Sequence, residues 1–193
     1  VGSEFKDQSG TLKKSVVTIE SPRGSEYNLD THWGWEPIPG YTPLVAMSHM
    51  GPDEDDPDYI HTWPNQWPDK LDDPLDPGWA GSWNGYFGKN QKNAEQESYF
   101  IMDDYNDAEF DYYPDSMDFE RRGMGLTCQI RGLQWNHILA EDVLFWLYDI
   151  KNISDYDLEK MVFGYIVGTI TGGDGDSGDD WADFEKSDDI AFS

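Results

Sequence analysis

Proline and tryptophan share one stretch of this chain, and together they limit its possible folds more than any other feature. Nine of the eleven prolines lie between Pro37 and Pro77, and six of the nine tryptophans lie within residues 33–83. Proline fixes φ and removes a backbone donor, so it interrupts helices and interior strands. The sequence therefore predicts a long irregular Trp/Pro-rich segment over residues 27–88. Because indole rings bury large apolar areas, we expect the tryptophans to pack this segment onto a core.

Strand-like stretches lie on both sides of this segment. They are rich in β-branched and apolar side chains with partial alternation, and they occupy residues 11–20, 98–103, 125–135, 143–153 and 161–171. The last two are separated by a polar turn, which predicts that they form a hairpin. We therefore predict an all-β fold, mainly an antiparallel β-sandwich with a jelly roll as one arrangement, in a single domain spanning residues 1–193.

The two ends of the chain suggest that it is a fragment of a larger protein. Two adjacent cloning sites encode the Gly-Ser-Glu-Phe of residues 2–5, so residues 1–5 are candidates for cloning-derived sequence, and residues 190–193 resemble the opening of a strand.

The only cysteine, Cys128, cannot form an intrachain disulfide, which fits the cytosol and equally a secreted protein. The longest apolar run, residues 143–148, is far shorter than the ~20 residues of a membrane-spanning helix, so we expect no membrane insertion.

The charge of the chain limits the classes of partner that it is expected to bind. The formal charge is −26 and the aromatic content is 15%, a combination that argues against an acidic disordered tail because such tails lack aromatic residues. Acidic residues outnumber basic ones 39 to 13, so we expect no nucleic-acid partner. Of the 39 acids, 25 lie within residues 53–76, 103–120 and 174–189. Crowded carboxylates repel one another unless a cation neutralises them, and oxygen-rich clusters favour Ca²⁺. A halophilic surface is the alternative, and it predicts evenly spread charge.

The sharpest acidic cluster is residues 174–185. Counted from Asp174, acids stand at positions 1, 3, 7 and 12, as in an EF-hand loop. Gly178 and Asp179 depart from that motif, which requires an Asp or Asn followed by glycine. We therefore predict a calcium loop between strands, with a solvated turn as the alternative. Its candidate ligands are Asp174, Asp176, Asp179, Asp180 and Asp183.

A second acidic cluster follows the strand predicted at residues 98–103 and alternates acids with aromatic residues. Its candidate calcium ligands are Asp103, Asp104, Asn106, Asp107 and Glu109. Here a metal site and a solvated acidic surface are equally compatible with the sequence. A third acidic stretch, residues 51–58 with its acids at 53–58, has fewer apolar neighbours and is interpreted as an exposed loop, with a binding site as the alternative.

Motifs for catalysis are weak in this sequence. It contains neither a Gly-x-Ser-x-Gly elbow nor a His-Glu-x-x-His helix, whereas glycoside hydrolysis needs only two carboxylates and is not excluded. Exposed aromatic rings can stack on sugars, and the candidates for ligand binding are Trp63, Trp67, Trp79, Trp83 and Tyr86. The alternative, which we favour, is that these rings pack the irregular segment onto the fold.

Several motifs resemble those of one family. They are Tyr-Asp-Ile-Lys-Asn-Ile-Ser at residues 148–154, Val-Phe-Gly at 162–164, the acidic loop at 175–184, and the Trp/Gly-rich stretches at 67–70 and 78–85. Together they resemble β-sandwich modules of large secreted bacterial surface proteins, many of them type IX secretion substrates, over residues 63–192. Residues 168–171 lack the Asp-x-Asp that often precedes the acidic loop in that family. The resemblance implies a surface module only, and its motifs say little about activity.

The sequence therefore predicts a non-enzymatic, calcium-binding module of a secreted or cell-surface protein with a structural or adhesive role. Its expected partners are other surface proteins or extracellular glycans. The alternative is a carbohydrate-active domain, either a glycan-binding module or a glycoside hydrolase, that uses the Trp-rich segment.

Overall fold

The computed structural model describes residues 1–17, 34–38, 45–53, 55–56, 58–107, 113–165, 183–187 and 190–192. These parts of the chain are built from antiparallel β-strands, as predicted, and contain no α-helix. Two short 3₁₀ turns, η1 (Pro68–Lys70) and η2 (Pro77–Trp79), each begin at a proline. No helix in the described ranges is long and apolar enough to cross a membrane.

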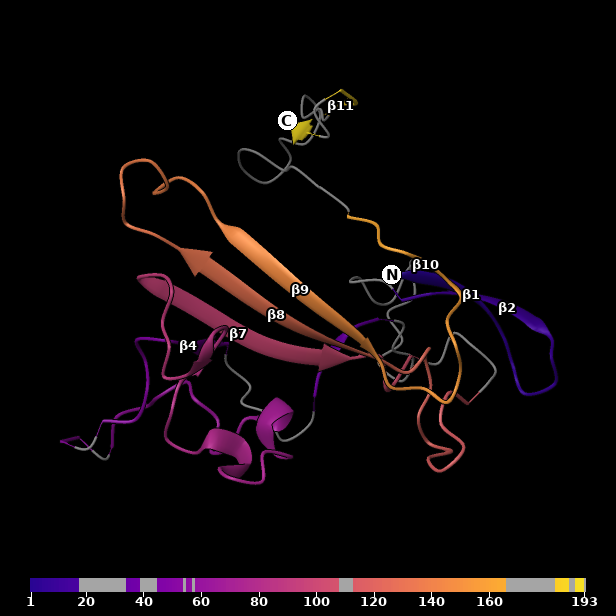
Figure 1. Cartoon of the computed structure of the whole chain (residues 1–193), viewed down its shortest axis with the longest axis horizontal. Helices are drawn as coiled ribbons and strands as arrows, with labels where there is room; N and C mark the ends of the chain where they lie inside the picture. The colour runs from indigo at the N-terminus through magenta and orange to yellow at the C-terminus, as the bar shows by residue number, and fades with distance from the viewer. Residues whose placement is uncertain are drawn as a thin grey trace, which may run out of the picture.

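The largest sheet has five strands, and its three long strands lie side by side in Figure 1. These are β7 (Gln96–Asp103), β8 (Leu126–Gln134) and β9 (Phe145–Asn152). The short strands β3 (Glu36–Pro37) and β4 (Ala46–Met47) both pair with β7. Their order is β3-β7-β8-β9, so β9 lies at the end of the sheet among the described strands.

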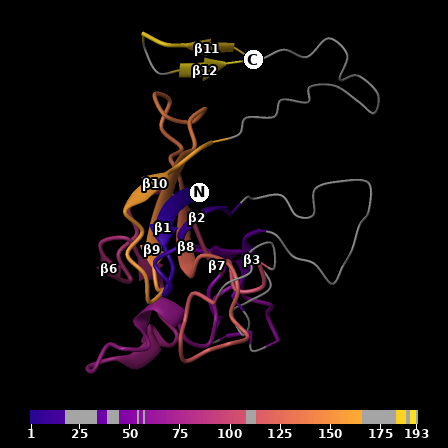
Figure 2. The same cartoon turned by 90° about the vertical axis from the view of Figure 1, so that its right-hand side faces the viewer.

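A second sheet lies near one end of the first, and Figure 2 shows it in front of β8 and β9. It has the order β10-β1-β2, formed by β1 (Gly2–Lys6), β2 (Leu12–Val16) and β10 (Lys160–Val162). Phe5 of β1 and Val17 are buried together with Met124 and with Leu126 of β8. This cluster is an apolar contact between the two sheets.

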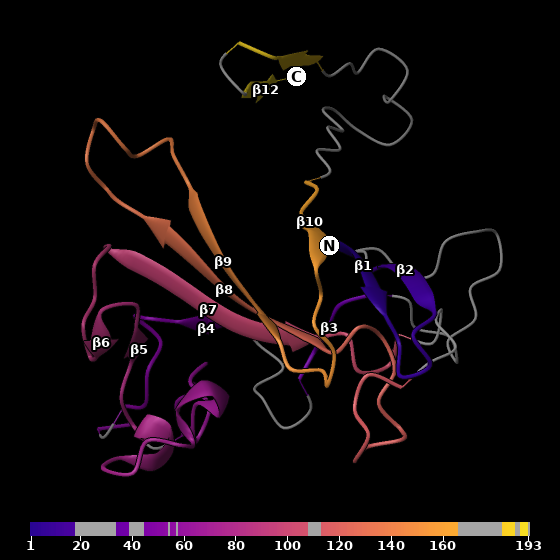
Figure 3. The same ribbon diagram turned by 45° about the vertical axis from the view of Figure 1, so that its right-hand side comes forward.

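Two further pairs of strands complete the described structure. The turn pair β5 (Asn84–Gly85) and β6 (Gly88–Lys89) belongs to the Trp-rich segment, and the pair β11 (Asp183–Glu185) and β12 (Ile190–Phe192) lies near the C-terminus. Figure 3 shows η1, η2, β5 and β6 on the β7 side of the large sheet, well separated from β1, β2 and β10.

The long strands lie where the sequence predicts them, but the predicted hairpin is wrong over its described part. β9 lies within the predicted residues 143–153 and pairs with β8. Met161 and Val162, predicted to return along β9, instead pair with Ser3 and Gly2 of β1. Residues 166–171 of the predicted strand lie outside the described residues.

Candidate functional site

The described part of the second acidic cluster is centred on the buried carboxylate of Asp104. Its Oδ1 accepts hydrogen bonds from the Leu126 backbone N–H (2.8 Å) and from Arg121 Nη2 (3.3 Å). Its Oδ2 accepts the Met124 backbone N–H at 2.7 Å. Asp104 therefore connects the end of β7 to the segment that enters β8. We call Asp104, Arg121, Met124 and Leu126 the Asp104 clamp.

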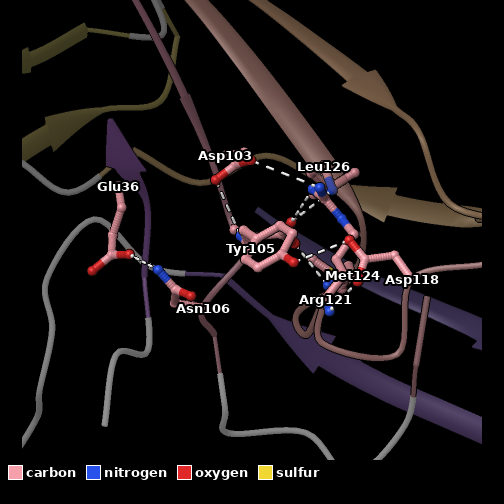
Figure 4. A network of polar contacts seen from close by, with 9 residues as sticks. Glu36, Asp103, Tyr105, Asn106, Asp118, Arg121, Met124 and Leu126 are labelled. Atoms are coloured by element: carbon pink, nitrogen blue, oxygen red, sulfur yellow. Dashed lines mark hydrogen bonds and ion pairs between the residues drawn. The ribbon is translucent and has the colours of Figure 1, made fainter. Parts of the chain in front are cut away.

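Neighbouring side chains extend this network, as Figure 4 shows. The Tyr105 hydroxyl donates to Asp118 Oδ2 at 3.0 Å, and the Arg121 guanidinium lies 5.3 Å from the centre of the Tyr105 ring. On the other side, the Asn106 side-chain amide donates to Glu36 Oε2 at 2.6 Å. Asp103 accepts the Tyr105 backbone N–H at 3.2 Å, an Asx turn that ends β7.

Glycine at position 123 permits the close approach of the two segments of the clamp. Its φ is +73°, a conformation that side-chain-bearing residues rarely adopt. A Cβ atom at this position would lie 2.4 Å from the Asp104 backbone oxygen and 2.6 Å from Asp104 Cγ. A larger residue would therefore push Asp104 out of the clamp.

Burial dominates the electrostatics of the clamp. It raises the pKa of Asp104 to about 6, because desolvation outweighs the stabilisation by the two backbone N–H groups and Arg121. Burial also raises the pKa of Asp103, although its carboxylate lies 3.7 Å from Arg121 Nη1. Asp104 thus acts as an internal anchor: its buried carboxylate holds two backbone N–H groups and Arg121 in place.

The predicted calcium ligands of this cluster do not converge in the described structure. Asp104 is fully buried and both of its oxygens accept protein hydrogen bonds, so it is not available as a metal ligand. Asp107 is also fully buried, whereas Asn106 is exposed and bonded to Glu36. Among the described residues, no group of three or more His, Cys, Asp or Glu side chains is placed to hold a metal ion.

Of the remaining candidate ligands, the structure describes only Asp183. Asp183 begins β11 and is exposed. The other predicted ligands lie outside the described residues, and they are Glu109, Asp174, Asp176, Asp179 and Asp180.

The predicted aromatic platform is largely a core. Trp67 and Trp83 are fully buried and meet edge to face, with ring centres 5.4 Å apart. Trp67 also meets the ring of Tyr99, on β7, at 5.5 Å. The indole N–H of Trp67 donates to the Ser82 backbone oxygen at 2.7 Å. Neither indole ring is accessible to a ligand in this structure, because both pack the segment onto the sheet, which is the interpretation that we favoured from the sequence.

Three of the five predicted ligand-binding aromatics are at least partly accessible. Trp63 and Trp79 pack against the Trp cluster, and their indole N–H groups donate to the Met47 backbone oxygen and to Asp73 Oδ2. Tyr86 is 57% exposed in the turn between β5 and β6, where its ring contacts Phe87.

Two buried charged residues of this region were not singled out from the sequence. Glu97 of β7 is 1% exposed, and its Oε2 accepts the Trp83 indole N–H at 2.7 Å. Arg131 of β8 lies 4.5 Å from the centre of the Tyr99 ring and donates to the Asn84 backbone oxygen. The alternation of side chains along a strand could have shown that Glu97 is buried, because it lies on the same face of β7 as the buried Tyr99.

The outer edge of the large sheet is apolar and exposed. Four consecutive residues of β9, Phe145 to Tyr148, are each 37% to 47% exposed. A groove of about 740 Å³ runs between β9 and the turn that carries Tyr86. Its lining includes five consecutive β9 residues, 146–150.

Comparisons of the chain with protein-family models, curated proteins and solved structures gave no match. The described residues thus define a mainly β fold of antiparallel sheets with a tryptophan-centred core. The family resemblance of its motifs stays a prediction.

Proposed function

We propose that this chain is a non-enzymatic β-sandwich module of a secreted or cell-surface protein, with a structural or adhesive role, and that calcium stabilises it. The observation that carries this proposal is the use of buried carboxylates as internal anchors. Asp104 and Glu97 are 0% and 1% exposed and bind backbone N–H groups, an arginine and an indole. A catalytic carboxylate has to reach a substrate, and these two side chains do not reach the surface.

The sandwich itself is part of the proposal. Its support is the apolar contact between the sheets, in which Phe5 of the β10-β1-β2 sheet is buried with Leu126 of β8. The opposite side of the large sheet carries the Trp cluster on Tyr99 and Ile101 of β7. Since Tyr99 and Leu126 are both fully buried, each side of the sheet contributes to a core.

Calcium is expected to raise the melting temperature of the metal-stripped protein. A ligand that binds only the folded state, at 100 times its Kd, adds about 2.7 kcal/mol of stability. For a chain of this length, that corresponds to a shift of roughly 5–10 °C. Differential scanning calorimetry with and without calcium, and with a chelator, measures the shift. No change on adding calcium would contradict the proposal.

Matched variants locate the calcium effect. The double variant Asp174→Asn/Asp176→Asn removes two predicted ligands and is expected to abolish most of the shift. The control Asp55→Asn/Asp56→Asn removes the same charge from the acidic loop at residues 53–58 and is expected to keep it. If calcium shifted the melting temperature of both variants equally, Asp174 and Asp176 would not be its ligands. The calcium would then bind elsewhere or act by general screening of charge.

Glycan binding is a second candidate function, favoured by the position of Tyr86. Its exposed ring lines the groove beside β9 together with Lys70, Gln129 and Asp149. An aromatic face with adjacent polar side chains is an arrangement that could hold a sugar ring.

A glycan array tests the second candidate. We expect any glycan signal to be lost in Tyr86→Ala, because the stacking surface is removed. We expect it to be retained in Phe119→Ala, which removes an exposed ring outside the groove. The absence of any signal from the unmodified protein would contradict this candidate while leaving the structural role untouched.

A further inference from the structure

The outer edge of β9 has the properties of a strand that pairs with another chain. Among the described strands β9 pairs only with β8, so its other edge has no described partner strand. Phe145 to Tyr148 of this strand are each 37% to 47% exposed. Residues 146–150 border a groove that also reaches Gln129 and Arg131 of β8 and Phe163. Proteins normally protect such an edge with charge, proline or a covering segment, because an exposed apolar edge pairs with other strands.

The hydrogen-bonding direction of each β9 residue follows from its pairing with β8. The Ile153 backbone N–H donates to the Gly125 backbone oxygen at 2.8 Å, so Ile153 points its backbone toward β8. In an antiparallel strand the backbone direction alternates from residue to residue. The backbone N–H and C=O groups of Trp146, Tyr148, Ile150 and Asn152 are therefore directed away from β8, toward the outer edge of the sheet.

Charge then selects one arrangement if a second β9 strand pairs with this edge. We compare three antiparallel registers near the centre of the strand, centred on Asp149, Tyr148 and Ile150. In each of them, the residues whose backbone groups point away from β8 stand opposite one another. Centred on Asp149, the pairing would place Asp149 against itself, which is unfavourable. Centred on Tyr148, it would place Asp149 opposite Leu147, so the charge has no partner. Centred on Ile150, it places Asp149 of each copy opposite Lys151 of the other, and in both pairs the residues stand at close, non-hydrogen-bonded positions.

We propose that two copies of this chain form a symmetric dimer by antiparallel pairing of their β9 strands about Ile150. The pairing joins the two large sheets into one continuous sheet. It forms two Asp149–Lys151 ion pairs and places Leu147 of each copy opposite Ile153 of the other. It also covers apolar side chains on both faces of β9, which are exposed in the single chain. A two-fold arrangement of this kind closes on itself and stops at the dimer.

The dimer is tested by sedimentation velocity of the full chain over a wide range of protein concentration. We expect a reversible monomer–dimer equilibrium. The single variants Asp149→Lys and Lys151→Asp each turn two attractive pairs into two repulsive ones, so each is expected to raise the dimer Kd roughly tenfold or more. The double variant Asp149→Lys/Lys151→Asp restores both pairs in reversed order and is expected to return the Kd close to that of the unmodified protein.

The double charge reversal distinguishes pairing about Ile150 from other modes of dimerisation. Circular dichroism of each variant confirms that it is folded. A monomer at every concentration would overturn the proposal and would mean that another segment or another protein covers the β9 edge. A dimer that tolerates both single reversals, or one that the double reversal fails to restore, would equally overturn the pairing about Ile150.

Discussion

The Asp104→Ala variant is expected to lose about 3–5 kcal/mol of unfolding free energy at pH 7, because it removes one partner of a buried charged network. The substitution leaves the backbone N–H groups of Met124 and Leu126 without the carboxylate that accepts them, and it leaves Arg121 without its 3.3 Å contact. Each buried donor without an acceptor costs about 1–3 kcal/mol. Urea denaturation followed by tryptophan fluorescence measures the loss.

The matched control for this prediction is Glu120→Ala. Glu120 lies in the same loop as Arg121 and is exposed, so the control removes the same charge without removing a buried acceptor. Its expected change in unfolding free energy is within about 0.5 kcal/mol. If both variants lost the same unfolding free energy, the effect of Asp104→Ala would come from removing a negative charge and not from removing the hydrogen bonds of the clamp.

The loss in Asp104→Ala is also expected to depend on pH. Burial raises the pKa of Asp104 to about 6, so the folded protein holds this proton more tightly than the unfolded chain does. The stability from this group is then fully present below about pH 4 and is lost as the pH rises through about 6. The alanine variant lacks the titration, so its deficit is expected to be larger at pH 4 than at pH 7, by up to about 3 kcal/mol. A deficit that shrinks on acidification would contradict the raised pKa.

The strands were predictable because their signal is local. β7 and β8 fill stretches of apolar, alternating residues, and such alternation needs no knowledge of the partner strand. The partner of residues 161–162 was not predictable in the same way. Nothing in their local pattern distinguishes pairing with β9 from the observed pairing with β1, because that choice is made by tertiary contacts 156 or more residues apart in the chain, such as Lys160 with Glu4.

The acidic cluster shows a similar limit. Its density of carboxylates indicated a cation, and the structure supplies a cation from the chain itself, Arg121, 17 residues beyond Asp104. The run Arg-Arg-Gly-Met-Gly at residues 121–125 was a usable signal, since it combines two cations with two glycines that both adopt positive φ at 123 and 125. What the sequence could not show is the turn that brings this run back beside the end of β7.

The Trp67→Ala variant is expected to lose about 3–5 kcal/mol of unfolding free energy, the usual cost of truncating a buried aromatic residue. Trp67 is fully buried between Trp83 and Tyr99, so its removal leaves a cavity where the irregular segment meets β7. Trp67→Phe keeps a ring but loses the hydrogen bond to Ser82, so a smaller loss of about 1–3 kcal/mol is expected. Urea denaturation measures both.

Trp146→Ala is the control for Trp67→Ala, because Trp146 is 46% exposed on β9. Its expected loss is about 1 kcal/mol at protein concentrations where the chain is monomeric. If Trp67→Ala were as mild as this control, the indole would not hold the segment on the sheet, and Trp67 would again be a candidate for ligand binding. A large loss for Trp67 would instead identify it as a core residue. The aromatic side chains accessible to a ligand would then be those of Tyr86 and β9.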